Sequence, residues 1–349
     1  MRILVTGGAG FIGSHVAEYY ARNDNEVIIF DNLLRNEILG KKIGDPFYNW
    51  NYLKQYKNIK LIKGDIRNFD EVKAISNNVN AIIHTAAQVA VTTSITDPRT
   101  DFEINALGTF NILEAARLND ASLVFISTNK VYGENVNKIP LIERDTRYEF
   151  ADPNYKSGIP ETFPIDLTQH SPYGCSKLAA DIYVQDYAHT YGLKTGILRL
   201  SCCYGERQFG VEDQGFLAHF VISTVLDKKI TIYGTGKQVR DVLHVEDLVK
   251  AIDLILKKAK ASPGDVYNIG GGANNAISLL EVIKYIERIS GKKIQLEFDK
   301  WRKADQKVYI SDIRKAEEKL GWRPKISWEE GIARLYNWVS NHRQLFTES

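Results

Sequence analysis

Residues 2–13 read RILVTGGAGFIG, and this stretch decides the fold. Residues 2–6 form an apolar, β-branched run that is typical of a buried strand. The motif GAGFIG (8–13) has the spacing G-x-G-x-x-G and opens a helical pattern over 11–22. Glycines allow a tight turn and the close approach of a phosphate, and a helix N-terminus offers free N–H groups to that anion. The stretch therefore predicts a dinucleotide site. Its candidate ligands are Gly7, Gly10, Phe11, Ile12 and Gly13.

An acidic residue supports this interpretation. The run 26–30 predicts a second strand, which Asp31 ends 18 positions after Gly13. A carboxylate there accepts hydrogen bonds from both ribose hydroxyls and repels a 2′-phosphate. A glycine-rich loop would explain the glycines alone, but not the strand, the helix and the acid together. We therefore expect NAD rather than NADP, with Asn32 as a further ligand.

Two more strand ends fit a bound dinucleotide. Asp65 and Ile66 follow the third predicted strand, where the adenine ring should lie. Asp65 is also suited to cap the next helix, and the two roles are compatible. Thr85, Ala86 and Ala87 end the fourth strand with small side chains, as close packing against a dinucleotide requires.

Strand and helix patterns alternate through the first half of the chain. This alternation predicts an α/β fold, with a Rossmann-type, doubly wound parallel sheet and helices on both faces. The predicted strands are 2–6, 26–30, 59–63, 80–85, 122–127 and 194–200, and the predicted helices between them are 11–22, 70–76, 100–118 and 176–191. The second half is less regular, and two stretches, 33–58 and 135–170, look inserted.

Tyr173 and Lys177 form a Tyr-x-x-x-Lys pair near the start of a predicted helix. Residues four apart share a helix face, so we expect the ammonium to lie beside the phenol. A phenol with a pKa near 10 is a poor base at neutral pH. A neighbouring ammonium and a positive nicotinamide ring would favour the phenolate and lower that pKa. The pattern is common by chance, and its weight comes from following a dinucleotide turn and a fifth strand.

The fifth strand ends in STNKVYG (127–133). Strand ends of this kind face the ligand crevice of a parallel sheet. A hydroxyl there can hydrogen-bond the reacting oxygen while Tyr173 takes its proton, and we choose Thr128 for this role. Capping of the strand end is the alternative reading of Thr128.

The bulk properties exclude several classes of protein. The 349 residues carry a net charge of +2, which implies no strong attraction to nucleic acid or to a membrane. We find no signal peptide and no apolar run of about 18 residues, so we expect a cytoplasmic protein. Three cysteines, Cys175, Cys202 and Cys203, and seven histidines show neither a disulfide framework nor metal-ligand spacing. We expect no metal.

These motifs together resemble the extended short-chain dehydrogenase/reductase family over essentially the whole chain. They are TGGAGFIG (6–13), the Asn105-x-x-Gly108-Thr109 pattern, STNKVYG, SPYGCSK (171–177) and VRDVLHVED (239–247). Within the family, DPNYKSGIPE (152–161), YGERQFG (204–210) and GKQVRDVLH (236–244) are more similar to 2-epimerases of CDP-sugars than to UDP-galactose 4-epimerases.

The resemblance implies transient oxidation of a sugar hydroxyl by tightly held NAD, which is regenerated in each turnover. In the 2-epimerases the oxidised carbon is C2, and CDP-paratose gives CDP-tyvelose; CDP-glucose and CDP-mannose are related candidates. It also implies that Asn105 and Ser127 contact NAD and that Asn129 contacts the sugar. A UDP-sugar 4-epimerase is the alternative enzyme. A catalytically silent NAD-binding regulator is the alternative class.

Arginines are candidate ligands of the substrate diphosphate, because a guanidinium chelates phosphate oxygens. Arg240 matches the family's Arg-Asp motif, and Arg302 heads an Arg-x-x-Asp-Gln sequence; surface ion pairing is the alternative for both. Arg207, Gln214 and Gly215 fall in a loop that we expect to face the nucleotide.

Three departures from the family bear on the reaction. Sugar-nucleotide 4,6-dehydratases carry an acidic pair after the strand-five hydroxyl, whereas this chain has Asn129 and Lys130. Cys202 replaces an asparagine that is common in 4-epimerases. The run QVAVTTS (88–94) differs from the segment typical of 2-epimerases, which leaves the sugar open.

The same reasoning divides the chain in two. We expect residues 1–200 to form the NAD-binding Rossmann domain, with 241–264 packing back onto it. Residues 201–240 and 265–349 should form a smaller α/β sugar-nucleotide-binding region. Helices near 100–118 and 176–191 carry apolar faces suited to a homodimer or homotetramer, unless the core covers them entirely.

Overall fold

The structure is a computed structural model that describes residues 1–40, 44–261, 263–302 and 304–347. A parallel seven-stranded sheet forms its centre, in the order β3-β2-β1-β4-β5-β8-β12. The predicted Rossmann-type, doubly wound sheet is confirmed. Its strands are β1 (Arg2–Thr6), β2 (Glu26–Asp31), β3 (Ile59–Lys63), β4 (Ala81–His84), β5 (Ser122–Thr128), β8 (Thr195–Leu200) and β12 (Asp265–Ile269).

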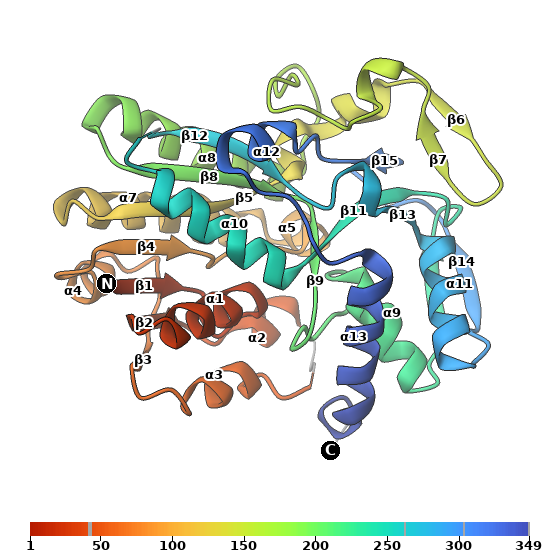
Figure 1. Cartoon of the computed structure of the whole chain (residues 1–349), viewed down its shortest axis with the longest axis horizontal. Coiled ribbons are helices and arrows are strands. Elements are labelled where there is room, and N and C mark those ends of the chain that lie inside the picture. The colour runs from red at the N-terminus through yellow and green to blue at the C-terminus, as the bar shows by residue number, and fades with distance from the viewer. Residues whose placement is uncertain (41–43, 262, 303, 348–349) are drawn as a thin grey trace.

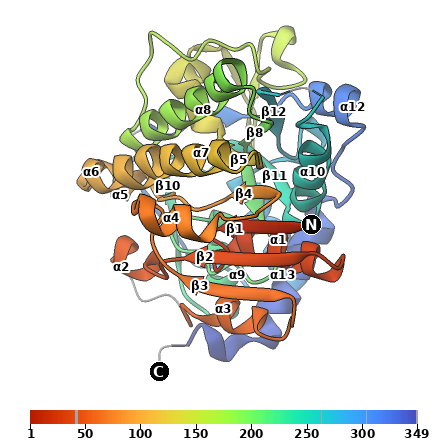
Figure 2. The ribbon, with the colours of Figure 1, turned by 90° about the vertical axis from the view of Figure 1, so that its left-hand side faces the viewer.

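Helices cover both faces of this sheet (Figures 1 and 2). On one face, Val5, Ile29 and Leu198 pack with α1 (Phe11–Arg22) and α10 (Val245–Lys258). The other face packs against α4 (Phe69–Ile75), α7 (Gly108–Leu118) and α8 (Pro172–Tyr191). Because the central strands are buried on both sides, they read as continuous apolar runs rather than as alternating ones.

Shorter elements complete the first region and its two insertions. Where a helix was predicted over 100–118, a π-helix at Glu103–Leu107 separates two α-helices; such π-turns occur often at functional sites. The shorter elements of the first region are α2 (Arg35–Leu39), α3 (Tyr48–Leu53), α5 (Val91–Thr96), α6 (Pro98–Phe102), the 3₁₀ segment Asn129–Lys138, β6 (Leu141–Glu143) and β7 (Tyr148–Phe150).

A second layer of structure follows β8. Its core lies between α9, α11 and α13 and the strands beside them, and β11 joins three other strands, β9, β13 and β15. The elements are β9 (Cys202–Tyr204), α9 (Phe216–Val225), β10 (Ile230–Tyr233), β11 (Val239–His244), β13 (Ala276–Ser278), α11 (Leu279–Ser290), β14 (Leu296–Asp299), β15 (Val308–Tyr309), α12 (Arg314–Leu320) and α13 (Trp328–Asn341). Since β12 lies in the large sheet, a division by sheets would assign 265–269 to the first region.

The insertion 135–170 is anchored to the rest of the chain by backbone contacts. Ile159 donates its N–H to the Ile310 carbonyl oxygen at 2.7 Å and accepts from the Asp312 N–H at 3.0 Å. Gly158 has φ +111° there, and a Cβ at this position would lie 2.5 Å from the carbonyl oxygen of Ile310. Only glycine fits this close approach without strain.

We predict that Gly158→Ala lowers the free energy of unfolding by about 3 kcal/mol, because strain and overlap add. Gly291→Ala is the matched control, since Gly291 also has a positive φ but nothing lies within 4 Å of its Cβ position. The control should cost about 1 kcal/mol. Urea denaturation of both variants measures the difference, and equal losses would contradict the anchoring role of Gly158.

Candidate functional site

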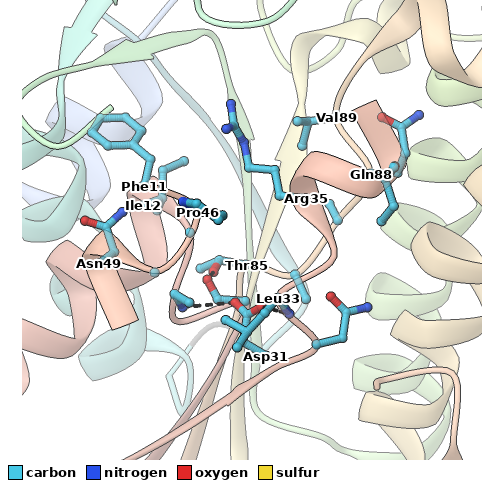
Figure 3. A pocket seen from close by; sticks show the side chains of 18 of the residues that line it. Phe11, Ile12, Asp31, Leu33, Arg35, Pro46, Asn49, Thr85, Gln88 and Val89 are labelled. Carbon is cyan, nitrogen blue, oxygen red and sulfur yellow. Dashed lines mark hydrogen bonds between the residues drawn. The ribbon is translucent and has the colours of Figure 1, made fainter. Parts of the chain in front are cut away.

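A cavity opens at the carboxyl edge of the large sheet (Figure 3). It lies between the glycine-rich turn, the ends of β2, β3 and β4, and residues from 33–39, 45–49 and 207–214. The predicted cofactor ligands that line it are Gly7, Gly10, Phe11, Ile12, Gly13, Asp31, Asn32, Asp65, Ile66, Thr85, Ala86 and Ala87. The sequence pattern therefore gathers these side chains at one place, as a dinucleotide requires.

At two positions of the glycine turn, any side chain would clash with the neighbouring backbone. Gly7 has φ +68°, and a Cβ on it would lie 2.6 Å from the Ala86 nitrogen. A Cβ on Gly13 would lie 2.3 Å from the Gly7 carbonyl oxygen. Alanine at either position would push the turn away from β4 or from the start of α1. Both glycines are thus required by the tight path of the backbone.

Asp31 is held at the end of β2 by backbone donors. Its carboxylate accepts from the N–H groups of Ala9, at 3.0 Å, and Leu33, at 2.8 Å. Burial raises the pKa of Asp31, and the nearby charge of Asp65 raises it further. Burial also raises the pKa of Asp65, but hydrogen bonds from Arg67 and Asn32 outweigh it and bring that pKa to about 2. The site therefore holds a fixed negative charge at the strand ends.

Sequence reasoning missed the contribution of the first insertion to the cavity. Arg35 lines it and donates to the Phe209 carbonyl oxygen at 2.7 Å and to Gln214 Oε1 at 2.8 Å. Burial lowers the pKa of Arg35 to about 10. The insertion itself was visible in the sequence, but nothing in its pattern indicated which residues face the cavity. Leu33, Asn49 and Val89 are further lining residues that the sequence did not indicate.

Two predicted substrate ligands lie in this same cavity. Arg207 and Gln214 line it, on the loop that follows β9. The Arg207 guanidinium pairs with Glu18 at 2.6 Å and lies over the Tyr52 ring, 4.2 Å from its centroid. Gly215 immediately precedes α9 and has a positive φ of +79°. The cavity lining therefore brings the loop 207–214 to the cofactor residues.

The predicted base lies in the first turn of α8. The Ser171 hydroxyl caps this helix by accepting from the Gly174 N–H, and the Tyr173 N–H donates to Ser94 Oγ at 3.1 Å. Burial raises the pKa of Tyr173 to about 12, a hydrogen bond with the Thr128 hydroxyl opposes the shift, and Asp101 adds to it. The protein's own groups therefore raise this pKa, whereas the sequence led us to expect a lower one.

Lys177 lies one turn further along α8. Its ammonium donates to the Ile126 carbonyl oxygen at 2.7 Å and lies 4.1 Å from the centroid of the Phe125 ring. Burial lowers the pKa of Lys177 to about 7, and the charges of Asp181 and Asp101 oppose that shift. The lysine is thus tied to β5, at a depth where its charge depends on nearby carboxylates.

Asn105 contacts the rim of the cavity through Gln88. Its side chain accepts from the Gln88 N–H at 2.9 Å and donates to the Gln88 carbonyl oxygen at 3.0 Å. It also donates to Asp101 and to the Ser176 hydroxyl, both at 3.1 Å. The π-helix places Asn105 where it holds the backbone after β4 against α8. Ser127, another predicted cofactor contact, donates to Asp181 at 2.5 Å.

The residues after Thr128 are engaged with the segment 304–306. Asn129 donates to Gln306 Oε1 at 3.2 Å, and Lys130 Nζ donates to the Ala304 carbonyl oxygen at 3.1 Å. Burial lowers the pKa of Lys130, while Asp305 raises it. These positions hold an amide and a buried amine, both fixed by hydrogen bonds.

Both predicted diphosphate ligands form ion pairs. Arg240 pairs with Asp305 at 2.6 Å, and Arg302 pairs with Asp213 at 3.2 Å and stacks 3.9 Å from the centroid of the Tyr233 ring. Neither arginine lines the cavity described above. Within the described ranges, no group of three His, Cys, Asp or Glu side chains is placed to hold a metal ion.

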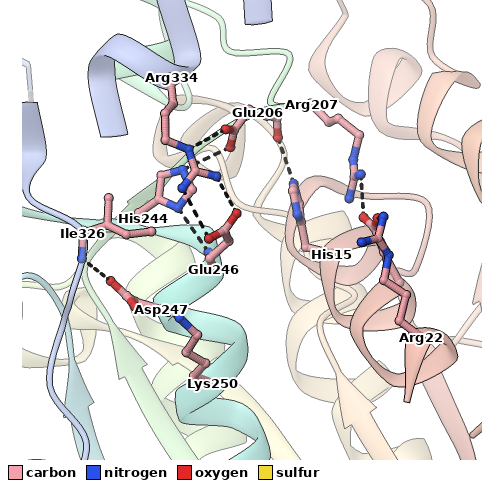
Figure 4. A network of polar contacts seen from close by, with 11 residues as sticks. His15, Arg22, Glu206, Arg207, His244, Glu246, Asp247, Lys250, Ile326 and Arg334 are labelled. Carbon is pink, nitrogen blue, oxygen red and sulfur yellow. Dashed lines mark hydrogen bonds and ion pairs between the residues drawn. The ribbon is translucent and has the colours of Figure 1, made fainter. Parts of the chain in front are cut away.

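A polar network ties the cofactor helix α1 to the second layer (Figure 4). Glu206 accepts from Arg334 at 2.9 Å and contacts His244 Nε2 at 3.0 Å, while its carbonyl oxygen contacts His15 Nε2 at 2.9 Å. Arg334 also pairs with Glu246. Burial raises the pKa of Glu206, but its hydrogen bond with His244 and its positive neighbours outweigh this and bring it to about 2.

The fold and site together define the class of protein. The parallel sheet, the glycine turn after β1, the acid that ends β2 and the Tyr173/Lys177 helix are the features of a Rossmann-type enzyme of the extended short-chain dehydrogenase/reductase class. Residues 4–335 match the family described as GDP-mannose 4,6 dehydratase, and the chain belongs to this family. The resemblance inferred from the motifs is confirmed.

Relatives of the chain act on several nucleotide sugars. CDP-paratose 2-epimerase of Salmonella typhi is 40% identical over 98% of this chain and 100% of that protein. A UDP-glucose 4-epimerase of Thermotoga maritima, solved with UDP-glucose, has a TM-score of 0.80 and 31% identity, covering 98% of this chain and 100% of the other. UDP-glucuronic acid 4-epimerase of Bacillus cereus, solved with UDP-glucuronic acid and NAD, has a TM-score of 0.81 and 29% identity, with the same coverages. None of the helices in the described parts is long and apolar enough to span a membrane.

We predict that Glu206 stabilises the fold in a defined pH range. Its pKa lies below the ordinary 4.5, so its contribution is full above about 4.5 and is lost as the pH falls toward about 2. The loss of unfolding free energy in Glu206→Gln should therefore be largest near neutral pH and shrink toward pH 3. Urea denaturation at a series of pH values measures it, with the exposed Glu37→Gln as the control. A difference that stays constant with pH would contradict the assignment.

Proposed function

We propose that the chain is an NAD-dependent epimerase that inverts C2 of a CDP-sugar, with CDP-paratose and CDP-tyvelose as the preferred pair. The observation that carries this proposal is the placement of Tyr173 and Lys177 one turn apart on α8, with the Thr128 hydroxyl at the end of β5 acting on the Tyr173 phenol. The 40% identity with CDP-paratose 2-epimerase along the whole chain supports the choice of nucleotide and carbon.

The residues that line the cavity fit NAD. Gly7 and Gly13 allow the tight path of the turn, and Asp31 presents a carboxylate at the end of β2. The 2′-phosphate of NADP would bring more negative charge close to Asp31 and Asp65. The resulting repulsion favours NAD over NADP. Arg207 and Gln214, expected at the nucleotide of the substrate, line this cavity, and we now propose them as cofactor neighbours together with Arg35. When bound, NAD⁺ supplies a hydride acceptor and a positive ring charge that favours the phenolate.

The chain's own residues handle the proton. Tyr173 takes a proton from the sugar hydroxyl as it is oxidised to a ketone, and returns it when the ketone is reduced from the other face. The Thr128 hydroxyl, which acts on the phenol, holds the reacting oxygen in line. Since burial raises the pKa of Tyr173 to about 12, the positive charge of Lys177 is needed close by.

The strand-five end favours epimerisation over the dehydration in the family's name. Elimination of water from the sugar needs a proton donor and a base beside the ketone. Asn129 has no acidic proton, and Lys130 donates to the Ala304 carbonyl oxygen. Neither position offers the acidic pair of a dehydratase, which favours return of the hydride to the ketone over elimination of water.

Arg240 and Arg302 remain our proposed diphosphate ligands. Each is paired with a carboxylate, and a diphosphate must compete with Asp305 or Asp213 for the guanidinium. Asn129 and Gly215 stay proposed contacts of the sugar and the nucleotide. We also keep the two-region division, with 1–200 and 241–264 holding NAD and with 201–240 and 265–349 holding the CDP-sugar.

A homodimer or homotetramer is the proposed assembly. Phe102 and Phe110 are exposed on the α6–α7 side, next to exposed Ile182 and Tyr183 of α8. The Phe110 and Tyr183 rings contact each other at 5.9 Å between centroids. These apolar side chains are not covered by the core of the chain, as a subunit interface requires.

Two alternatives keep a stated basis. A UDP-sugar 4-epimerase is supported by the likeness to the Thermotoga maritima enzyme. A silent NAD-binding regulator would be expected to lack the catalytic pair, whereas Tyr173 and Lys177 are both present and buried at the site.

We predict that purified protein converts CDP-paratose to CDP-tyvelose and leaves UDP-glucose unchanged. Nucleotide-sugar products are separated by anion-exchange chromatography and identified by NMR at C2 and C4. Exclusive formation of UDP-galactose would refute the 2-epimerase proposal. The absence of any 4-keto-6-deoxy product from CDP-glucose would agree with the missing acidic pair.

We predict that Tyr173→Phe lowers kcat about 10³-fold or more, because the proton acceptor is removed and the ring is kept. The melting temperature and NAD affinity should change little. The matched control is Tyr183→Phe, since Tyr183 lies on the same helix but is half exposed. Turnover that survives in Tyr173→Phe would show that another group is the base.

A further inference from the structure

Asp181 lies on α8, one turn after Lys177 and two turns after Tyr173. Tyr173, Lys177 and Asp181 are spaced four residues apart, so they follow one face of the helix. The Asp181 side chain is fully buried, with 0% exposure. A charged residue is rarely buried completely unless it is paired, and the reaction described above gives Asp181 no part.

Three side chains saturate this carboxylate. Arg199 of β8 donates to both oxygens, from Nε and from the terminal nitrogen, each at 3.1 Å. Gln185 donates at 2.7 Å to Oδ1, and the Ser127 hydroxyl donates at 2.5 Å to Oδ2. Arg199 keeps its charge at any working pH, and its guanidinium pairs with the buried Asp181 side chain.

Two hydrogen bonds hold the end of β5 against α8. Lys177 Nζ donates to the Ile126 carbonyl oxygen, and Ser127 donates to Asp181. Ser127 directly precedes Thr128, whose hydroxyl acts on the Tyr173 phenol and lowers its pKa. A change at Asp181 would therefore move β5 relative to the helix that carries the base.

Titratable groups from three elements act on or are affected by the Lys177 ammonium. They are Asp181 from its own helix, Asp101 from α6 and His84 from β4. Burial lowers the pKa of His84 to about 3, so this ring is neutral at neutral pH. Burial also lowers the pKa of Lys177 to about 7, and Asp181 is the larger of the two charges that oppose it. Near pH 7 the charge on Lys177 therefore responds to any change at Asp181.

The support for Asp181 reaches into the second insertion. Arg199 also donates to the Tyr132 hydroxyl and to the Glu161 carbonyl oxygen, both at 3.3 Å. Its guanidinium lies 5.2 Å from the centroid of the Tyr132 ring. The Glu161 carboxylate accepts from the Asn268 N–H of β12 at 2.7 Å. Arg199, and through it the Asp181 carboxylate, is thus supported by Tyr132, Glu161 and Asn268, which come from three separate parts of the chain.

We propose that Asp181 is a positioning residue that keeps Lys177 charged and holds the Thr128 end of β5 in register with Tyr173. This role rests on the proposed function, in which a charged Lys177 assists the Tyr173 base. Asp181 acts through Lys177 and Ser127 and does not touch the substrate.

The test titrates Lys177 directly by NMR, with lysines labelled at Cε and the Lys177 signal assigned by its loss in Lys177→Met. Most lysines titrate near 10.4, which leaves a signal near 7 well resolved. In Asp181→Asn we expect that signal to titrate at a pH lower by about one unit or more. In Gln185→Ala, which removes one hydrogen bond and leaves the carboxylate, the titration should move by less than about a third of that. An unchanged Lys177 titration in Asp181→Asn would overturn the proposal.

A kinetic readout separates this role from a merely structural one. The limb of the kcat profile that falls as the pH rises through the Lys177 pKa should move to lower pH in Asp181→Asn and return in Asp181→Glu. A uniform loss of kcat at every pH would count against the proposal. If Lys177 titrates as expected but no CDP-sugar is turned over, the positioning of Lys177 stands and the proposed substrate fails.

Removal of one partner of a buried ion pair can prevent folding. The double variant Asp181→Asn/Arg199→Gln removes both charges and leaves no unpaired one. Its Lys177 signal should also titrate below the wild-type value, because Asp181 and Asp101 are the charges that act on the ammonium. A wild-type titration in a folded double variant would refute the proposal.

Discussion

The parallel pairing of the seven strands is the constraint on which the rest of the molecule depends. The carboxyl ends of parallel strands lie at the same edge of a sheet, so side chains that are distant in sequence come together there. Asp31 at the end of β2, Thr85 after β4 and Thr128 at the end of β5 share that edge. Of the helices that connect the strands, α1 begins at the glycine turn and α8 packs beside β5. The cofactor cavity and the proposed proton-transfer pair follow from one topology.

The same burial that orders the site works against its chemistry. It raises the pKa of Tyr173 to about 12 and lowers that of Lys177 to about 7, so each group is driven toward its neutral form. In the proposed mechanism the phenol must lose a proton and the ammonium must keep one, and both requirements call for charges placed close by. Asp181 and Asp101 provide negative charge for the lysine. In the proposed mechanism the positive ring of NAD⁺ would favour the phenolate.

The sequence predicted those parts of the molecule that follow from local pattern. The strand, turn and helix of 2–22 and the four-residue spacing of Tyr173 and Lys177 are each readable within a few turns of chain. The groups that face Arg35, Lys130 and Asp181 are not readable, because they lie far along the chain and meet only through packing. The rise that burial causes in the Tyr173 pKa is not readable for the same reason, since burial depth is a property of the folded core. The π-helix at Glu103–Leu107 has no sequence pattern of its own either.

The two insertions illustrate how such long-range contacts adapt a common fold. The first places Arg35 and Asn49 beside the cofactor turn, where they bond the 207–214 loop from across the cavity. In the second insertion, the Glu161 carbonyl oxygen accepts from Arg199 of β8, and the Glu161 carboxylate accepts from the Asn268 N–H of β12. Neither insertion adds a strand to the large sheet, so the edge geometry stays unchanged while its surroundings differ. Because catalysis needs that edge intact, variation in the family is expected to concentrate in such segments, which shape the approach to the reacting atoms and their support from behind.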